Sequence, residues 1–283
     1  MNYDELSLYS AFTDTPSGGN PAGVWIADVL PDDDAMLRIA DEVGFSETVF
    51  AKPAQDDSYD VRYFSPKAEV SFCGHVTIAL GARLAQERGA GRYLLNTQAG
   101  EVWVDVDTRG EVGEATLTSV APHYEHASPA LVGTVLDLLG RTKTDLDPTL
   151  APAVTFAGAN HLVVPLDNRD LLRDIDYDFD SMLEVMEAHD LTTVNVIFRE
   201  SNEVVHARNL FPVGGVIEDP ATGAAAAALG GYLRELAPSS VPLDFVIHQG
   251  DDLGRPSLLR VHAPLSGGIE VSGQAVPIPE SKH

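Results

Sequence analysis

Short segments in the first half of the chain alternate between apolar and polar residues. Residues 6–12 alternate with a period of two, which is typical of a strand that buries one face. Glycine, proline and aspartate separate this segment from others of similar length, and such residues favour turns. The pattern therefore predicts a series of strands, over residues 6–12, 22–26, 48–51, 59–64 and 101–106.

Two further segments of the first half predict helices. Residues 32–34 are three aspartates that can cap a helix, and Gly44 is suited to ending it. The apolar residues between them have helical spacing: Met36, Ile39, Ala40 and Val43. The run 74–84 begins with glycine and is apolar almost throughout, which predicts a buried helix.

The second half of the chain repeats this order of elements. Strand patterns recur at 162–165, 194–198 and 204–210, and an alanine-rich helix then begins at Gly223. Superposing Gly74 on Gly223 also superposes Gly81 on Gly230. An ordered series of matching elements indicates an internal duplication. We therefore expect an N-terminal domain over 1–125 and a C-terminal domain over 150–283, joined by 126–149. An alternative pairing is a crossover, in which the C-terminus supplies the last strand of the first domain.

Composition narrows the class of protein. The chain has 283 residues, of which 44% are hydrophobic, and its formal net charge is −25. Such a charge argues against binding to nucleic acid or anionic membranes, which attract clustered Lys and Arg. One cysteine cannot form an intramolecular disulfide or a cysteine-rich zinc site, and it suits a reducing compartment. With no apolar run near ~20 residues and an acidic start, we expect a cytoplasmic protein.

The acidic excess has two interpretations. The chain has 43 Asp and Glu against 18 Lys and Arg, and lysine is especially scarce. One hypothesis is adaptation to a cytoplasm of high salt, which screens repulsion between surface carboxylates. The other is a GC-rich genome that favours Arg, Ala and Asp. A salt series of melting temperatures distinguishes them.

Each half places a glycine where its buried helix begins, at Gly74 and Gly223. A helix N-terminus carries unpaired N–H groups and partial positive charge, and glycine lets a ligand approach the backbone. Two such termini facing each other across a domain cleft would bind an anion, for which a substrate carboxylate is the natural candidate. The chain has neither a Walker A nor a Rossmann glycine pattern, so we predict no nucleotide.

Few ionisable residues lie near these helix starts. Glu47 has apolar neighbours in the sequence, and a carboxyl in an apolar cleft suits proton transfer because desolvation raises its pKa. His75 is one residue into the first helix, where the helix terminus favours a neutral ring. Each also has a structural alternative: a strand-end acid for Glu47, a core or capping residue for His75, a helix N-cap for Asp219, and a small buried residue for Cys73.

These segments resemble the phenazine-biosynthesis isomerase (PhzF-like) family, which shares the diaminopimelate epimerase fold. The motifs follow the family order over most of the chain: Phe12-Thr13-Asp14, Gly19-Asn20-Pro21-Ala22, Ser46-Glu47-Thr48, Arg62-Tyr63-Phe64-Ser65-Pro66 with Glu69, Cys73-Gly74-His75-Val76-Thr77 and Glu218-Asp219-Pro220-Ala221-Thr222-Gly223. The resemblance implies an α+β fold of two pseudo-symmetric domains, each a mixed β-sheet wrapped around a central helix. It also implies a site between the domains, no cofactor, no metal and a homodimer.

The resemblance also implies roles for individual residues. Glu47 corresponds to the family's acid/base, and His75 and Asp219 to its other catalytic residues. Gly74 and Gly223 correspond to glycines of the site, and Gly223 presents a backbone N–H to the substrate carboxylate. Asn20 is a candidate substrate-side or loop-fixing residue. Ala224 stands where the family often has serine, which argues against the phenazine precursor itself as substrate.

The epimerase branch of the fold uses two cysteines, one at each helix start. Cys73 corresponds to the first, but the second position is Pro220, and the chain has no other cysteine. A two-thiol mechanism is therefore excluded, and the resemblance favours a proton shift by Glu47 on a small carboxylate. Two alternatives stay open: a lyase or dehydratase that uses the same proton abstraction, and a non-catalytic relative that only binds a ligand or a protein.

Overall fold

The computed structural model describes residues 3–108 and 113–279. Its contacts divide the chain into two compact units. Unit 1 comprises Met1–Thr118 and Ser272–His283, and unit 2 comprises Ser119–Val271. The C-terminal segment therefore returns to the unit in which the chain begins. Among the described residues, no helix is long and apolar enough to cross a membrane.

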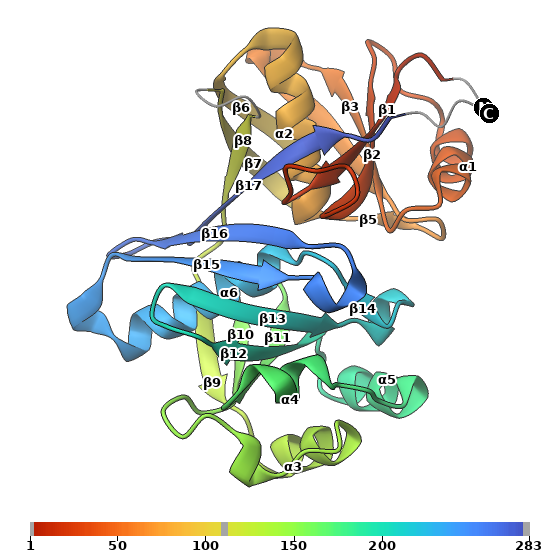
Figure 1. Ribbon diagram of the computed structural model, residues 1–283. Coiled ribbons are helices and arrows are strands. Elements are labelled where there is room, and N and C mark those ends of the chain that lie inside the picture. Colours follow the sequence, from red (N-terminus) through yellow and green to blue (C-terminus); the bar gives the residue numbers. More distant parts are fainter. Residues whose placement is uncertain (1–2, 109–112, 280–283) are drawn as a thin grey trace. The chain divides into compact units, whose positions relative to one another are not determined.

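Unit 1 is a mixed sheet that closes on itself around a helix (Figure 1). The pairings run from β1 through β2, β3, β4, β6, β7 and β8 to β17, and β17 pairs with β1 again. The short β5 pairs with β4 only at the C-terminal end of that strand. The strands are β1 (Leu6–Ala11), β2 (Asn20–Ile26), β3 (Thr48–Pro53), β4 (Tyr59–Phe64), β5 (Glu69–Val70), β6 (Gly91–Thr97), β7 (Gly100–Asp107), β8 (Glu114–Thr118) and β17 (Glu270–Pro277).

The helix inside this sheet is α2 (Gly74–Arg88), which is buried over most of its length. A helix that is apolar on all sides can be stable only inside a core, and α2 packs against strands all around it. Gly81 permits the closest approach, because a Cβ there would lie 2.9 Å from Val104 and 3.2 Å from Ala115. The sequence prediction of a buried helix over 74–84 is confirmed, with one more turn at its C-terminus.

The other helix of unit 1, α1 (Asp33–Val43), lies outside the sheet and follows the local signals in the sequence. The Asp32 side chain accepts a hydrogen bond from the Ala35 N–H at 2.8 Å. Gly44 ends the helix in the left-handed conformation, with φ of 69°. Met36, Ile39 and Ala40 are buried against Trp25, Phe50 and Phe64. The predicted cap, stop and apolar face are all confirmed.

Unit 2 is also a mixed sheet around a helix. Its pairings run from β9 through β10, β11, β12, β13 and β15 to β16, and the short β14 pairs with β13. The strands are β9 (His123–His126), β10 (Ala153–Phe156), β11 (Asn160–Leu166), β12 (Thr193–Arg199), β13 (Val204–Leu210), β14 (Glu218–Asp219), β15 (Leu243–Gln249) and β16 (Ser257–Ala263).

The central helix of unit 2 is α6 (Gly223–Leu236), which packs against β9, β10, β11, β15 and β16. Small alanine side chains and Gly230 allow this, since a Cβ at Gly230 would lie 2.9 Å from both Val261 and Ile269. The remaining helices are α3 (Pro129–Leu138), α4 (Arg169–Arg173) and α5 (Phe179–Ala188). Leucine, valine and methionine side chains of these helices join the core formed with β11 and β12. Helix α3 occupies part of the segment 126–149, which we expected to be a connection.

The two units have the same succession of strand pairings. The first two pairings are antiparallel and then parallel in each unit: β1–β2 and β2–β3, and β10–β11 and β11–β12. Antiparallel, parallel and antiparallel pairings follow in both. In each unit a two-residue strand, β5 or β14, also pairs with the strand that precedes it. Each central helix begins a few residues after that short strand.

Candidate active site

The first backbone N–H groups of α2 are not capped by a side chain. Cys73 is its N-cap residue, but the Cys73 side chain makes no capping hydrogen bond. The first hydrogen bond of the helix runs from the Thr77 N–H to the Cys73 carbonyl at 3.1 Å. The preceding N–H groups, from Gly74 to Val76, have no partner within the helix and carry its partial positive charge. A Cβ at Gly74 would have nothing within 4 Å, so there is space beside this backbone.

This lack of a cap distinguishes the two central helices from the other α-helices of the described residues. In α1, α3, α4 and α5, a side chain caps the N-terminus by accepting a backbone hydrogen bond: Asp32, Ser128, Asn168 and Asp178, respectively. Neither Cys73 of α2 nor Thr222 of α6 does so. A capping side chain would occupy the position that an anion takes at a helix N-terminus. Both predicted anion-binding starts are therefore uncapped by side chains.

Glu47, Cys73 and His75 come together beside the start of α2. The His75 ring is 6% exposed, and its Nε2 lies 3.6 Å from Glu47 Oε2. Its other nitrogen, Nδ1, lies 3.3 Å from Cys73 Sγ. Glu47 directly precedes β3, and its side chain is 16% exposed. The imidazole thus bridges a carboxylate and a thiol, which is a chain of groups able to hold and move a proton.

Neighbouring residues fix this cluster, and the sequence did not single them out. Ser46 Oγ lies 3.4 Å from His75 Nε2. Thr77 donates from its hydroxyl to the Cys73 carbonyl at 2.7 Å, and its Oγ1 lies 2.7 Å from the Tyr63 hydroxyl. Burial raises the pKa of Tyr63 above its usual range. Ser46, Tyr63 and Thr77 do lie in the motifs that carry the resemblance. Their membership of these motifs was the signal from which the sequence could have identified them as part of the site.

The cluster also contains the types of ligand that a transition metal prefers. One ligand atom each from Glu47, Cys73 and His75 lie within 4.8 Å of one another. A tetrahedral zinc ion would bring its ligand atoms to about 3.5 Å apart, as follows from its bond lengths. The His75 ring has one nitrogen beside the Cys73 thiol and the other beside the Glu47 carboxylate. The ring therefore lies between these two groups, and the three side chains are not directed at one ion.

Asn20 is the first residue of β2, where its backbone pairs with Ala11. It is 2% exposed, so its amide is part of the interior of unit 1. A buried amide needs hydrogen-bond partners, and such a side chain holds the surrounding backbone in place.

The start of α6 in unit 2 has the same backbone arrangement. Thr222 is the N-cap residue, Gly223 is the first helical residue, and Ala224 follows. The first helical hydrogen bond runs from the Ala226 N–H to the Thr222 carbonyl at 3.0 Å. Gly223 and Ala224 are half-buried. At the position after the glycine, unit 2 therefore presents a methyl group where unit 1 presents an imidazole.

Asp219 lies in unit 2, in β14, and is 8% exposed. The Thr222 hydroxyl donates to Asp219 Oδ2 at 2.5 Å. The alternative interpretation of Asp219 as the N-cap of the helix is wrong, because Thr222 holds that position. A residue before proline favours an extended backbone, and in that conformation Asp219 pairs with Asn209, so the helix starts only after Pro220.

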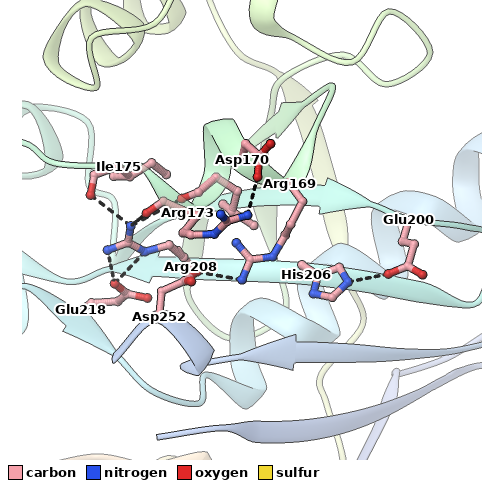
Figure 2. Close-up of polar contacts among 10 residues, drawn as sticks. Arg169, Asp170, Arg173, Ile175, Glu200, His206, Arg208, Glu218 and Asp252 are labelled. Atoms are coloured by element: carbon pink, nitrogen blue, oxygen red, sulfur yellow. Dashed lines mark hydrogen bonds and ion pairs between the residues drawn. The ribbon is translucent and has the colours of Figure 1, made fainter. Parts of the chain in front are cut away.

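A buried ion pair holds the strand that carries Asp219 (Figure 2). Arg208 donates through Nε and Nη2 to Glu218 Oε2, at 2.9 and 2.7 Å. Its Nη1 donates to the carbonyls of Arg173 and Ile175, each at 3.0 Å. Burial raises the pKa of Glu218, and the bonds from Arg208 oppose that shift. Separating the two charges would leave a buried charge without a partner, which costs free energy. The ion pair therefore keeps β14 in place.

Known proteins match this chain over nearly its whole length. The family model described as phenazine biosynthesis-like protein matches residues 9–281. Trans-2,3-dihydro-3-hydroxyanthranilate isomerase of Pseudomonas aeruginosa is 29% identical over 97% of this chain and 97% of its own. The uncharacterized isomerase YfhB of Bacillus subtilis is 28% identical over 98% of this chain and 97% of its own. The crystal structure of a PhzF-family protein of Bacillus anthracis covers 97% of this chain and 96% of its own with a TM-score of 0.87, at 24% identity.

Proposed function

Because the chain belongs to the family of phenazine biosynthesis-like proteins and is an isomerase like its relatives, we propose that Glu47 is the acid/base of a cofactor-independent proton shift. The observation that carries the proposal is the position of Glu47 in unit 1. Its carboxylate lies 3.6 Å from the buried His75 ring, beside a helix start that no side chain caps. A base and a group that stabilises negative charge therefore occur together.

The reaction requires no net change in protons. Glu47 takes a proton from a carbon of the substrate, and the electron pair spreads into an adjacent unsaturated or electron-withdrawing system. The proton exchanges with water while it is on Glu47, and the protonated Glu47 then gives one proton to a different carbon of that system. His75 keeps the carboxylate in place and assists the transfer. The N–H groups at the start of α2 stabilise the negative charge while it is delocalised.

The same proposal assigns the substrate carboxylate to the backbone. Few basic side chains are available in a chain of net charge −25, and helix starts attract anions without them. Gly74 in unit 1 and Gly223 in unit 2 are the glycines to which we assign this role. Asp219 orients the substrate or relays a proton, and Asn20 fixes the substrate-side loop. The duplicated two-domain organisation and the homodimer remain parts of the proposal.

The proposed substrate is a small unsaturated carboxylate. Ala224 offers no hydroxyl, so we do not extend the substrate of the Pseudomonas aeruginosa isomerase to this chain. That compound is nevertheless a rational first probe, because it has the required carboxylate and unsaturated carbons.

Incubation in D₂O tests the proposal. The wild-type enzyme is mixed with trans-2,3-dihydro-3-hydroxyanthranilate and with a panel of small unsaturated carboxylates, and products are followed by NMR and mass spectrometry. An isomeric product with one solvent deuterium on the newly protonated carbon is the expected result. Loss of water from the product would instead assign a lyase, and no exchange with any carboxylate would contradict catalysis.

A further inference from the structure

The turn that carries Asp219 is held by a buried glutamine from another strand. Gln249 is the last residue of β15, lies 27 residues from Thr222 in the sequence, and is 1% exposed. Its side-chain amide makes three hydrogen bonds, and all three go to Asp219 or Thr222. A fully buried amide that spends its bonding capacity on one turn has a defined orientation and restrains that turn.

The partners determine which way the amide points. Gln249 Nε2 donates to the Asp219 carbonyl at 2.7 Å and to Thr222 Oγ1 at 3.0 Å. Gln249 Oε1 accepts from the Thr222 N–H at 3.2 Å. With the amide reversed, its oxygen would face the Asp219 carbonyl and its nitrogen would face the Thr222 N–H. Only the first orientation gives every donor an acceptor.

This orientation also directs the hydroxyl of Thr222. A hydroxyl has one hydrogen to donate, and Gln249 already donates to Thr222 Oγ1. The hydroxyl hydrogen is therefore available for Asp219 Oδ2, to which Thr222 donates at 2.5 Å. Gln249, Thr222 and the Asp219 carboxylate form a directional chain of hydrogen bonds, in which each donor sets the next.

We propose that Gln249 is a positioning residue that sets the Asp219 carboxylate through the Thr222 hydroxyl. This inference rests on the proposed function, in which Asp219 serves the substrate. Gln249 does not itself take part in proton transfer. The Arg208–Glu218 pair (Figure 2) holds the residue before Asp219. Gln249 holds Thr222, the N-cap residue of α6, on the other side of Asp219 along the chain.

A double-mutant cycle tests this role. Gln249→Leu is expected to lower kcat/KM for the best carboxylate of the D₂O panel by about 10- to 100-fold, as small displacements of an orienting group do. In an Asp219→Asn background the same change is expected to cost less than about threefold, because Gln249 then has no carboxylate to position. Equal losses in both backgrounds would overturn the proposal, since a purely structural residue would act in either.

Two further variants define the chain of bonds. Thr222→Ser keeps the hydroxyl and is expected to retain most activity, whereas Thr222→Val is expected to lose as much as Gln249→Leu. The matched control is Gln98→Leu, because Gln98 is exposed and follows α2 as Gln249 follows α6. We expect that control to have wild-type kcat/KM.

A crystal structure of Gln249→Leu decides the question without turnover. The expected result is an Asp219 side chain that has left Thr222 Oγ1 or occupies more than one conformer, while the Arg208–Glu218 pair is unchanged. An Asp219 carboxylate in its original place would overturn the proposal. A wild-type enzyme inactive on every carboxylate would count against the proposed function, and this structure would still test the positioning role.

Discussion

The starts of α2 and α6 share a backbone and differ in their side chains. Both helices begin with a glycine, lack a side-chain cap and follow a two-residue strand. Unit 1 surrounds its glycine with Glu47, Cys73 and His75, which can all exchange protons. Unit 2 places Thr222 and Ala224 beside its glycine and holds Asp219 with hydrogen bonds from groups that do not titrate.

This difference suggests how two units with the same succession of strand pairings can have different roles. Thr192 directly precedes β12, as Glu47 directly precedes β3, and both of these strands pair in parallel with the strand before them. Unit 2 thus has a hydroxyl at the place where unit 1 has its proposed base. Uncapped helix starts occur in both units, whereas the proposed acid/base occurs in one.

Among substitutions at the two helix starts, replacing His75 should produce the largest effect. His75→Ala makes the start of α2 resemble that of α6, and it removes the ring between Glu47 and Cys73. We expect kcat to fall by about 100-fold, within the range of general acid–base assistance. Ala224→Ser, which only adds a hydroxyl in unit 2, should change kcat by less than about threefold. Steady-state kinetics check both, and equal effects would contradict the division of roles.

Gly74→Ala tests the backbone part of the site. Nothing lies within 4 Å of the added Cβ, so the variant should fold with an unchanged melting temperature. The methyl group would nevertheless stand beside the N–H groups that we assign to the substrate carboxylate, and we expect KM to rise by about tenfold.

The control for this variant is Gly133→Ala in α3, where a Cβ also has nothing within 4 Å. That change should leave the kinetics alone and stabilise the protein by up to about 1 kcal/mol, because alanine favours helix. An unchanged KM in Gly74→Ala would argue against carboxylate binding at the start of α2.

A buried histidine in unit 2 should affect stability and not catalysis. Burial lowers the pKa of His161 to about 3, and its Nδ1 lies 2.8 Å from Thr193 Oγ1. An unfolded chain binds a proton at this histidine below its ordinary pKa of about 6.5, and the folded chain does not. The free energy of unfolding should therefore fall as the pH drops, by about 2 kcal/mol from this group between pH 7 and pH 5.

Urea unfolding at several pH values measures this loss. His161→Asn should reduce the pH dependence of the unfolding free energy, whereas His189→Asn, at an exposed position, should not. The same pH dependence in all three proteins would rule out His161 as its source.

Salt should have the smallest effect on the site and act on both units together. Surface carboxylates in excess repel one another, and salt screens that repulsion. If the acidic composition reflects a saline cytoplasm, the melting temperature should rise steadily from low to molar KCl. A flat profile would favour the explanation from genome composition.

Local signals were sufficient for some of this structure. The cap at Asp32, the stop at Gly44 and the start of α2 at Gly74 depend on neighbours within a few residues, and all are where the sequence predicts. Asp219 shows the limit of such reasoning, because proline after it favours both a helix start and an extended backbone. Its pairing with Asn209 decided between them.

Long-range contacts could not be predicted from one sequence. The sequence assigned no role to Gln249, and its contact with Thr222 arises because β15 pairs in parallel with β13. The crossover of a C-terminal strand into the first domain was among our expectations, but the sequence did not identify β1 as the strand with which β17 pairs. The chain has many possible pairings of this kind, and local patterns do not rank them.

The most direct test of the account compares Glu47 with its counterpart in unit 2. Solvent deuterium exchange into the carboxylate substrate is measured for the wild type, Glu47→Gln and Thr192→Val. Because Glu47 is the proposed proton carrier, Glu47→Gln should exchange at least about 100-fold more slowly, and Thr192→Val should stay within about twofold of the wild type. Exchange at the wild-type rate in Glu47→Gln would contradict the account.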